Sequence, residues 1–257
     1  MKLSIITVNK NNCKGLQKTI DSILAQTWHD YEWIVIDGGS TDGSKELLEK
    51  HKDHFTYWCS EPDCGVYTAM NKGLAHAQGE WVNFMNSGDR FADSRTLDLV
   101  FSQSYEEDII YGYMMRKSLD GKPQNPSFMK TKIYWENFYF STIPHQSSFI
   151  RGKLFDKIGG YDESYSRVAD RKWFFQAIVI NGYKTRFIPV PLSIYECGGI
   201  SEDEFYQEEL LRMRKELFTE YIPIEDYRHI RDIHLIHEHS WSRFAYKVVR
   251  KLVRKRW

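Results

Sequence analysis

The sequence predicts an α/β protein built on a mostly parallel sheet, with a helical extension at its C-terminal end. Over the first hundred residues, short apolar runs alternate with segments of helical spacing, as in successive β-α-β units. The apolar runs are continuous, which is typical of strands buried on both faces. The chain of 257 residues is long enough for one large domain with its own core.

Each expected element follows from its own pattern. Apolar runs predict strands at 3–8, 32–37, 55–60 and 80–85, and helical spacing predicts helices at 14–28, 40–51 and 65–77. Asn11 or Asn12 is expected to cap the first helix, and Asp42 or Ser44 the second. Gly73 is expected to end the third, with Asn71 and Lys72 as ordinary residues of its last turn.

The second half of the chain is less regular. The pattern predicts a strand at 108–115, an aromatic loop at about 123–147, a helix at 169–183 that stops at Gly182, and an extended stretch at 184–196. Beyond residue 200 the chain becomes charged and helical, and an apolar stripe runs through Tyr206, Leu210, Met213 and Leu217. We therefore expect a main domain over 1–200 and a helical extension over 201–257.

Composition excludes several classes of protein. No apolar run approaches the roughly 20 residues that span a bilayer, and the apolar stretch near the N-terminus is too short for a signal peptide. The four cysteines are scattered without a Cys-x-x-Cys pair, which indicates reduced thiols rather than disulfides or a zinc site. We expect a cytoplasmic protein.

The zero net charge hides a basic tail. Seven basic residues and no acidic ones follow position 242, which leaves 28 basic against 35 acidic residues in the body, a formal charge of −7. Apolar residues of 241–257 recur at helical spacing, with basic residues between them. Such a helix binds an anionic membrane surface; the alternative is a helix docked on the protein itself. An acidic body disfavours nucleic acid as a partner.

Polar residues stand where three of the expected strands end: Thr7 and Asn9, then Asp37, then Asp89. In parallel α/β sheets, ligands bind outside the carboxyl ends of the strands. Asp37 can accept hydrogen bonds from a base or ribose there, and the glycines after it let the backbone turn. The alternative is that Asp37 and Asp42 only cap a turn and a helix, and that Asp89 is a turn carboxylate.

Four ordered motifs carry a resemblance to a known family. "LSIITVNKNN", "EWIVIDGGSTDGS", "SEPDCGVYTAMNKGLAHAQGEW" and "VNFMNSGDRF" resemble the family 2 glycosyltransferases of the GT-A fold, and in particular the bacterial branch that builds capsules and exopolysaccharides. The resemblance covers about 1–200. It implies a nucleotide-binding half at about 1–100 and an acceptor and catalytic half at about 101–200.

The resemblance also implies a nucleotide-sugar donor, UDP-linked in most relatives, and a divalent cation. Thr7, Asn9 and Asp37 would hold the base, and the segment of Asp63 and Gly65 would line the donor site. The family's Asp-x-Asp motif corresponds to 86–89, of which only the last acid remains. Asp89 would therefore bind Mn²⁺ or Mg²⁺, whereas Asn86 and Gly88 stand at the donor side of the same motif, Gly88 in place of a ribose-binding acid.

An inverting transfer needs a base for the acceptor hydroxyl. Asp170 matches the family's base position; alternatively it is an acid at the start of a helix. His145 and Gln146 match an "HQ" pair on the acceptor or leaving-group side, although a single His is often structural. Gly198 and Gly199 match a late glycine loop that folds over the diphosphate. Asp162 and Glu163 are expected to shape the loop before Asp170.

The resemblance implies an inverting, metal-dependent glycosyltransferase that acts on a glycan or lipid-linked acceptor in surface polysaccharide synthesis. With the basic tail, we expect it to be peripheral at the inner face of the cell membrane. The alternative is a catalytically degenerate nucleotide-binding scaffold of a polysaccharide-assembly complex, since the metal motif has lost an acid. A nicotinamide dehydrogenase is excluded, because G-x-G-x-x-G does not follow the first strand.

Overall fold

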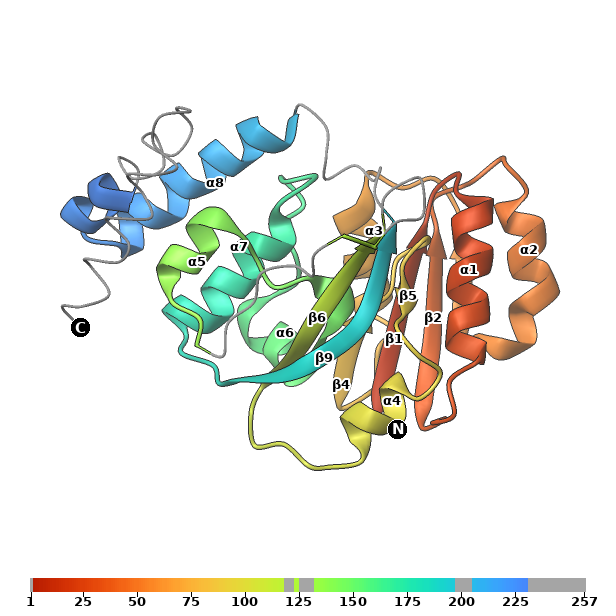
Figure 1. Ribbon diagram of the computed structural model, residues 1–257. Helices are drawn as coiled ribbons and strands as arrows, with labels where there is room; N and C mark the ends of the chain where they lie inside the picture. The colour runs from red at the N-terminus through yellow and green to blue at the C-terminus, as the bar shows by residue number, and fades with distance from the viewer. Residues whose placement is uncertain (1, 118–122, 125–131, 197–204, 231–257) are drawn as a thin grey trace. The chain divides into compact units, whose positions relative to one another are not determined.

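The computed structural model describes residues 2–117, 123–124, 132–196 and 205–230 (Figure 1). The chain divides into two compact units, the first ending at Glu209 and the second beginning at Leu210. The boundary lies within the helix α8 (Phe205–Tyr221), and residues 224–230 are also helical. All candidate site residues that the structure describes belong to the first unit.

The strands and helices of the first unit alternate along the chain. The strands are β1 (Leu3–Asn9), β2 (Tyr31–Asp37), β3 (Tyr57–Ser60), β4 (Trp81–Phe84), β5 (Arg90–Phe91), β6 (Ile109–Lys117), β7 (Pro123–Gln124), β8 (Ser148–Arg151) and β9 (Thr185–Glu196). The α-helices are α1 (Cys13–Leu24), α2 (Ser44–His51), α3 (Val66–Leu74), α4 (Thr96–Phe101), α5 (Trp135–Phe140), α6 (Lys153–Ile158) and α7 (Ala169–Phe175). Short 3-10 turns form η1 (Lys52–His54) and η2 (His145–Ser147), and a π-helical turn forms η3 (Gln176–Ile180).

The strands form one mixed sheet in the order β3-β2-β1-β4-β8-β6-β9-β5, with β7 paired to β6. The first four strands are mutually parallel, and β8 is antiparallel to both β4 and β6. The long strands β6 and β9 run parallel across the other half of the sheet (Figure 1). Because β1 and β2 pair in register up to Asn9 and Asp37, the residues that follow them emerge side by side at one edge.

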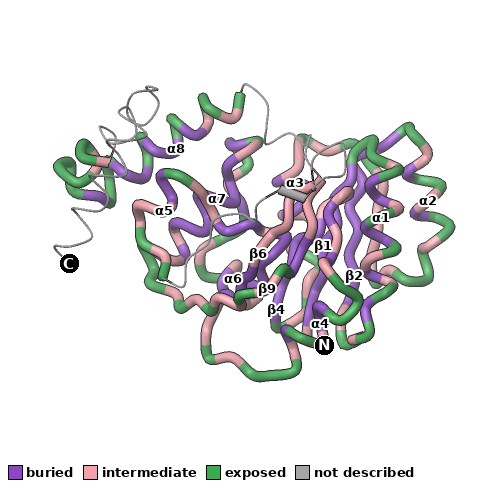
Figure 2. Tube along the Cα trace, in the orientation of Figure 1, coloured by how far each residue is buried: buried purple, intermediate pink, exposed green. Residues whose placement is uncertain are grey.

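The core lies on both faces of β1 and β2. Every residue of β1 is buried, and so are six of the seven residues of β2, as the continuous apolar runs predict (Figure 2). Leu16 and Ile20 of α1 and Leu48 of α2 pack against Ile5 and the strands beside it. The opposite face is covered by α3, so that helices lie on both sides of the parallel half of the sheet (Figure 1).

Helix boundaries follow local chemistry, with one correction. The side chain of Asn12 caps α1 by accepting a hydrogen bond from the backbone N–H of Gly15. Gly182 has a positive φ of 68° just after η3, where the sequence predicts a stop. Gly73 does not end α3, which continues to Leu74. A Cβ at position 73 would lie 2.5 Å from Cγ2 of Ile6, so glycine lets the helix approach β1 closely.

The aromatic stretch before His145 also corrects the sequence prediction, which expects a loop. Part of it lies outside the described residues, but 135–140 form the helix α5. The side chain of Asn137 accepts a hydrogen bond from the backbone N–H of Tyr134, and Phe138 and Tyr139 are buried. Trp135, Phe138 and Tyr139 do stand at helical spacing, but the helix has only six residues, and this signal was too short to distinguish it from a loop.

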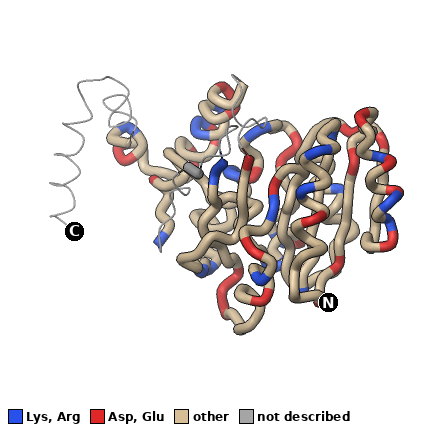
Figure 3. Tube along the Cα trace, turned by 45° about the vertical axis from the view of Figure 1, so that its right-hand side comes forward, with Lys and Arg blue, Asp and Glu red and all other residues tan. Residues whose placement is uncertain are grey.

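Along the Cα trace in Figure 3, positions of Lys and Arg are interspersed with positions of Asp and Glu. None of the described helices is both long and apolar enough to cross a membrane.

A buried carboxylate holds the edge of the sheet opposite the candidate site. Oε1 of Glu32, which is 2 % exposed, accepts hydrogen bonds from Oγ of Ser4 (2.5 Å) and from the backbone N–H groups of Gln78 (2.5 Å) and Gly79 (3.0 Å). These bonds tie β1, β2 and the approach to β4 together. Removing the carboxylate takes the acceptor from the buried hydroxyl of Ser4 and from the part-buried N–H of Gln78, and it leaves a cavity beside them.

We therefore expect Glu32→Ala to lower the free energy of unfolding by roughly 3 kcal/mol, as measured by urea denaturation. The control is Glu49→Ala on the exposed side of α2, which is expected to change it by less than about 0.5 kcal/mol. Equal stabilities of the two variants would contradict the structural role of Glu32.

Candidate active site

Asp37 lies buried at the junction of three strand ends. Its Oδ1 accepts from Nδ2 of Asn9 (2.7 Å) and Oγ of Ser40 (2.6 Å), and its Oδ2 accepts from the backbone N–H of Ser40 (2.9 Å) and Oγ of Ser60 (2.6 Å). Burial alone would raise the pKa of Asp37, but the hydrogen bonds from the two serines and Asn9 outweigh it and keep the pKa low. The charged carboxylate thus fixes the loop after β2, and a nucleotide base would have to replace one of these bonds to reach it.

Thr7 is not part of this cluster. Its side chain is fully buried, and its Oγ1 accepts a hydrogen bond from Nε1 of Trp33 at 3.0 Å. Since Trp33 belongs to the core cluster with residues of α1 and α2, the hydroxyl of Thr7 lies on the face of β1 that these helices cover. The structure therefore brings Asn9 and Asp37 together but leaves Thr7 apart.

Asp63 and Gly65 lie beside the same strand ends. Oδ1 of Asp63 accepts from the backbone N–H of Gly65 (3.2 Å) and from Nζ of Lys10 (3.3 Å). A Cβ added to Gly38 would lie 2.5 Å from Oδ2 of Asp63, so the glycine after β2 makes room for this carboxylate. Gly65, with φ of 138°, precedes α3. The segment before α3 is thereby held against the ends of β1 and β2.

Asp42 has a structural role in this arrangement. Its Oδ2 accepts from the backbone N–H of Cys13 at the start of α1 (2.8 Å). Its Oδ1 accepts from the backbone N–H (3.2 Å) and Oγ (2.6 Å) of Ser44 at the start of α2. One carboxylate therefore satisfies donors at two helix N-termini, which favours the capping interpretation of Asp42 over a ligand contact.

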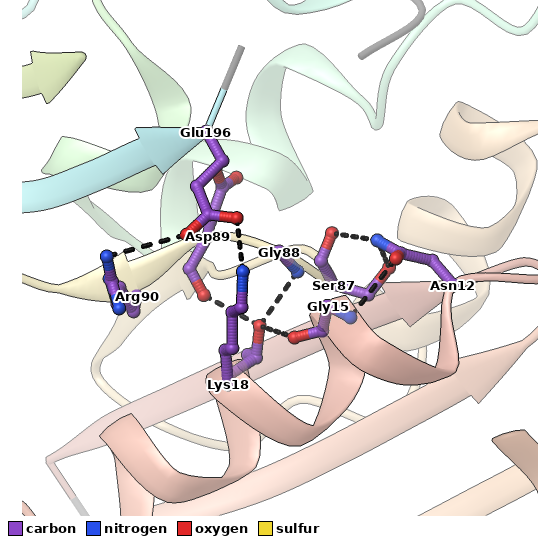
Figure 4. A network of polar contacts seen from close by, with 9 residues as sticks. Asn12, Gly15, Lys18, Ser87, Gly88, Asp89, Arg90 and Glu196 are labelled. Atoms are coloured by element: carbon purple, nitrogen blue, oxygen red, sulfur yellow. Dashed lines mark hydrogen bonds and ion pairs between the residues drawn. The ribbon is translucent and has the colours of Figure 1, made fainter. Parts of the chain in front are cut away.

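The loop 86–89 is held by backbone contacts to α1 (Figure 4). Oγ1 of Thr19 accepts from the backbone N–H of Gly88 (3.0 Å) and lies 2.7 Å from the carbonyl oxygen of Asp89. Nδ2 of Asn12 donates to the carbonyl oxygen of Ser87 at 3.0 Å. Gly88 has φ of 101°, a backbone conformation in which a residue with a side chain would be strained. The glycine that stands in place of a ribose-binding acid is thus the residue that this turn requires.

Glu196, the last residue of β9, lies next to loop 86–89. Its carboxylate pairs with Lys18 of α1 (2.5 Å) and Arg90 of β5 (3.5 Å), and Figure 4 shows it beside Asp89. The first pair links the end of β9 to α1, the helix that supports loop 86–89, and the second links it to β5.

Asp89 is a buried carboxyl group, and its polar neighbours offset only part of the cost of burying its charge. It is 6 % exposed. Burial raises its pKa to about 7, against the opposing effects of His145 and of a hydrogen bond from the side chain of Gln146, while the charge of Glu196 raises it further. A positive charge bound beside Asp89 would stabilise its carboxylate form.

His145 connects loop 86–89 to the candidate base. Its Nε2 lies 3.3 Å from Nδ2 of Asn86, and its Nδ1 lies 3.1 Å from Oδ2 of Asp170. With Asn86 donating to Nε2, the ring proton sits on Nδ1 and is donated to Asp170. Burial alone would lower the pKa of His145, but its hydrogen bond to Asp170 and the charges of Asp170 and Asp89 outweigh it, so the pKa is raised.

Asp170 begins α7 and is 8 % exposed. Its Oδ1 accepts from the hydroxyl of Tyr67 (3.0 Å) and from the backbone N–H of Arg171 (2.8 Å). Two residues from α3 and η2, Tyr67 and His145, therefore converge on one carboxylate from α7. An acid that only stabilises the start of a helix does not need these contacts from Tyr67 and His145, so they favour a role in the site.

The loop before Asp170 is fixed by α3. Nδ2 of Asn71 donates to Oε1 of Glu163 (2.8 Å) and to the carbonyl oxygen of Tyr161 (2.8 Å). Asp162 pairs with Lys172 at 2.7 Å; burial alone would raise the pKa of Asp162, but Lys172 and Ser164 lower it to about 2. Asp162 and Glu163 thus shape the loop, and Asn71 does more than end a helix.

The structure therefore forms two groups from the predicted site residues. Asn9, Asp37, Asp63 and Gly65 lie at the ends of β1 to β3, and Asn86, Asp89, His145, Gln146 and Asp170 lie around loop 86–89. Gly198, Gly199 and the basic segment 241–257, for which the sequence predicts a helix, lie outside the described residues. Their roles stay predictions.

Sequence patterns missed three partners of these groups. Ser40 and Ser60 satisfy Asp37, and Tyr67 satisfies Asp170. All three residues fall inside recognised motifs, but a motif does not state which side chains are in contact. Tyr67 and Asp170 are separated by 103 positions, so no local spacing links them.

Comparisons with known proteins agree with this arrangement. The family model described as glycosyl transferase family 2 matches residues 4–164. An uncharacterized glycosyltransferase of Mycobacterium tuberculosis is 35 % identical over 185 residues, which cover 69 % of each chain. A PGL/p-HBAD biosynthesis glycosyltransferase of the same organism is 30 % identical over 225 residues, covering 82 % of this chain and 83 % of the relative.

Solved structures support the fold class. The crystal structure of S. aureus TarS has a TM-score of 0.69 and 20 % identity, covering 95 % of this chain. This chain spans 45 % of TarS. Residues 1–349 of TarS in complex with UDP-GlcNAc give a TM-score of 0.68 over 95 % of this chain and 74 % of that one. The prediction of a GT-A fold is confirmed, and the chain belongs to glycosyl transferase family 2.

Proposed function

We propose that this chain moves one sugar, with inversion, from a UDP-linked donor to a hydroxyl of a glycan or lipid-linked acceptor. The observation that carries the proposal is the continuous set of contacts from Asn86 through His145 to Asp170. It joins the loop that holds the donor diphosphate in this family to a carboxylate that can accept a proton. A site that must break a sugar–phosphate bond and deprotonate an acceptor needs both within reach of one sugar.

The residues around loop 86–89 fit a divalent cation that brings most of its own ligands. Among the described residues, no three His, Cys, Asp or Glu side chains gather into a metal cage. Asp89 offers a buried carboxylate, and Oδ1 of Asn86 is a buried oxygen without a hydrogen-bond partner. Hard oxygen ligands of this kind suit Mn²⁺ or Mg²⁺, which take their other ligands from diphosphate and water. When bound, the cation would neutralise charge on the leaving diphosphate.

The chemistry that this chain would perform needs one base. Oδ2 of Asp170 would take the proton of the acceptor hydroxyl while the acceptor oxygen forms its bond to the anomeric carbon. The bond from that carbon to the diphosphate oxygen breaks, and its electron pair leaves with the nucleotide. Attack from the face opposite the leaving group inverts the configuration. His145, held between Asn86 and Asp170, would keep the carboxylate aligned with the donor.

The acceptor is proposed from the sequence and from a relative. The name of the PGL/p-HBAD biosynthesis relative joins a chain of this kind to a biosynthetic glycosyl transfer, and a basic amphipathic segment at 241–257 suits the surface of an anionic membrane. Together they favour a lipid-linked acceptor used at the inner face of the cell membrane.

Nucleotide release and product stereochemistry test the proposal. The purified chain is incubated with UDP-GlcNAc, UDP-glucose or GDP-mannose, octyl glucoside as a lipid-like acceptor, and Mn²⁺, and NMR reads the anomeric configuration of the product. We expect release of UDP and an inverted linkage with a UDP-linked donor. Binding of UDP without any turnover would favour the scaffold alternative, which the lost acid of loop 86–89 suggests. No binding of any donor would contradict both.

A further inference from the structure

We propose that Tyr67 is a positioning residue for the candidate base. Its hydroxyl, together with the backbone N–H of Arg171, holds Oδ1 of Asp170 and so leaves Oδ2 as the oxygen that receives the acceptor proton. The inference rests on the proposed function, in which Asp170 is the base.

The two oxygens of Asp170 have different surroundings. Oδ1 accepts from the hydroxyl of Tyr67 at 3.0 Å and from the backbone N–H of Arg171 at 2.8 Å, which uses both of its lone-pair directions. Oδ2 lies 3.1 Å from Nδ1 of His145. One lone pair of Oδ2 is therefore left for an acceptor hydroxyl, and the hydrogen bond from Tyr67 decides which oxygen that is.

The hydroxyl of Tyr67 is well fixed for this purpose. The residue is 5 % exposed in the first turn of α3, and its ring centroid lies 5.3 Å from that of Tyr161. Burial, with the charge of Asp170, raises the pKa of Tyr67 well above its usual value, so the hydroxyl keeps its proton and stays a donor. Ring packing rather than the hydroxyl holds the side chain, so removing the oxygen should leave the fold in place.

Loss of this hydroxyl would leave Oδ1 of Asp170 with the backbone N–H of Arg171 as its one donor and so loosen the orientation of the carboxylate. Oδ2 would then meet the acceptor at a less fixed angle, and misplacement of a reacting group slows the chemical step without weakening donor binding. Substitution of a residue that only supports the core would not lower the rate of the chemical step while leaving donor binding unchanged. The expected signature is therefore a change in kcat without a change in the donor KM.

Tyr161 supplies a matched control. It is 3 % exposed, lies in the same aromatic cluster, and its hydroxyl has no hydrogen-bond partner in the described structure. Tyr161→Phe removes the same atom as Tyr67→Phe from an equally buried ring, but it takes no donor away from Asp170.

The experiment compares wild type, Tyr67→Phe and Tyr161→Phe with the donor that the wild type turns over, and measures kcat, donor KM, melting temperature and UDP affinity. We expect Tyr67→Phe to lower kcat by about tenfold or more with an unchanged donor KM and UDP affinity. Tyr161→Phe is expected to stay within about twofold of wild type in every kinetic constant.

The outcomes separate this inference from the function beneath it. An active wild type with equal kcat for both variants, or a Tyr67→Phe variant that changes only the donor KM, would overturn the role of Tyr67 alone. A wild type that turns over no donor of the panel would overturn the proposed function, and the role of Tyr67 with it. A shared loss of melting temperature and UDP affinity in Tyr67→Phe would assign Tyr67 to the fold and likewise overturn the inference.

Discussion

Asp170→Asn is expected to abolish nearly all sugar transfer while leaving donor binding intact. The amide has the shape of the carboxylate, and its oxygen can still accept from Tyr67 and from the backbone N–H of Arg171. It cannot take a proton from the acceptor, and a positioned base contributes roughly 10²- to 10⁴-fold to such a step. We expect kcat to fall by about 10³-fold, measured as nucleotide release, with UDP affinity measured by calorimetry unchanged.

The matched control for this change is Asp156→Asn. Asp156 is an exposed residue of α6, and the substitution removes the same charge. It should leave kcat within about twofold of wild type. A fully active Asp170→Asn variant would exclude Asp170 as the base and return it to the role of an acid at a helix start.

The second large effect is expected at Asp89. Asp89→Asn removes the one carboxylate of loop 86–89 but keeps its size and its buried position. If Asp89 holds the cation on the diphosphate, UDP should bind wild type at least about tenfold more tightly with Mn²⁺ than without it. The variant should lose this difference, and its affinity for UDP without metal should match that of wild type.

Asp93→Asn is the control for this measurement. Asp93 lies four residues beyond Asp89, with its side chain 68 % exposed, and contacts Arg95 rather than the candidate site. The control should keep the full effect of Mn²⁺. An Asp89→Asn variant that still binds UDP more tightly with Mn²⁺ would place the cation on other residues.

The parallel half of the fold could be predicted because its signals are local. Continuous apolar runs give strands buried on both faces, and Asn12 or the glycine at 182 mark where helices start or stop. Since parallel strands end at the same edge of the sheet, the pattern alone predicted that Asn9 and Asp37 lie next to each other.

The parts that failed depend on contacts between distant segments. Gly73 was predicted to end its helix, but it is needed there because Ile6 of β1 leaves no room for a side chain at position 73. The motif did not show that the hydroxyl of Thr7 is buried and accepts a hydrogen bond from Trp33 of β2. The helix α5 has only six residues, so the helical spacing of Trp135, Phe138 and Tyr139 was too short a signal to reveal it.

The candidate site shows the same division. Motifs led to Asp89, His145 and Asp170 one at a time, but not to the order of contacts among them. The choice of Tyr67 as the partner of Asp170 arises only when α3 and α7 are packed together. Motifs can therefore suggest candidate residues one at a time, whereas the orientation of each side chain needs the folded structure.

A crystal structure with UDP and Mn²⁺ tests the central claim most directly. We expect the cation on the carboxylate of Asp89, the diphosphate beside Asn86 and His145, and Oδ2 of Asp170 facing the space where the acceptor would sit. Nucleotide bound elsewhere, or Asp89 and Asp170 opening to separate cavities, would contradict the account.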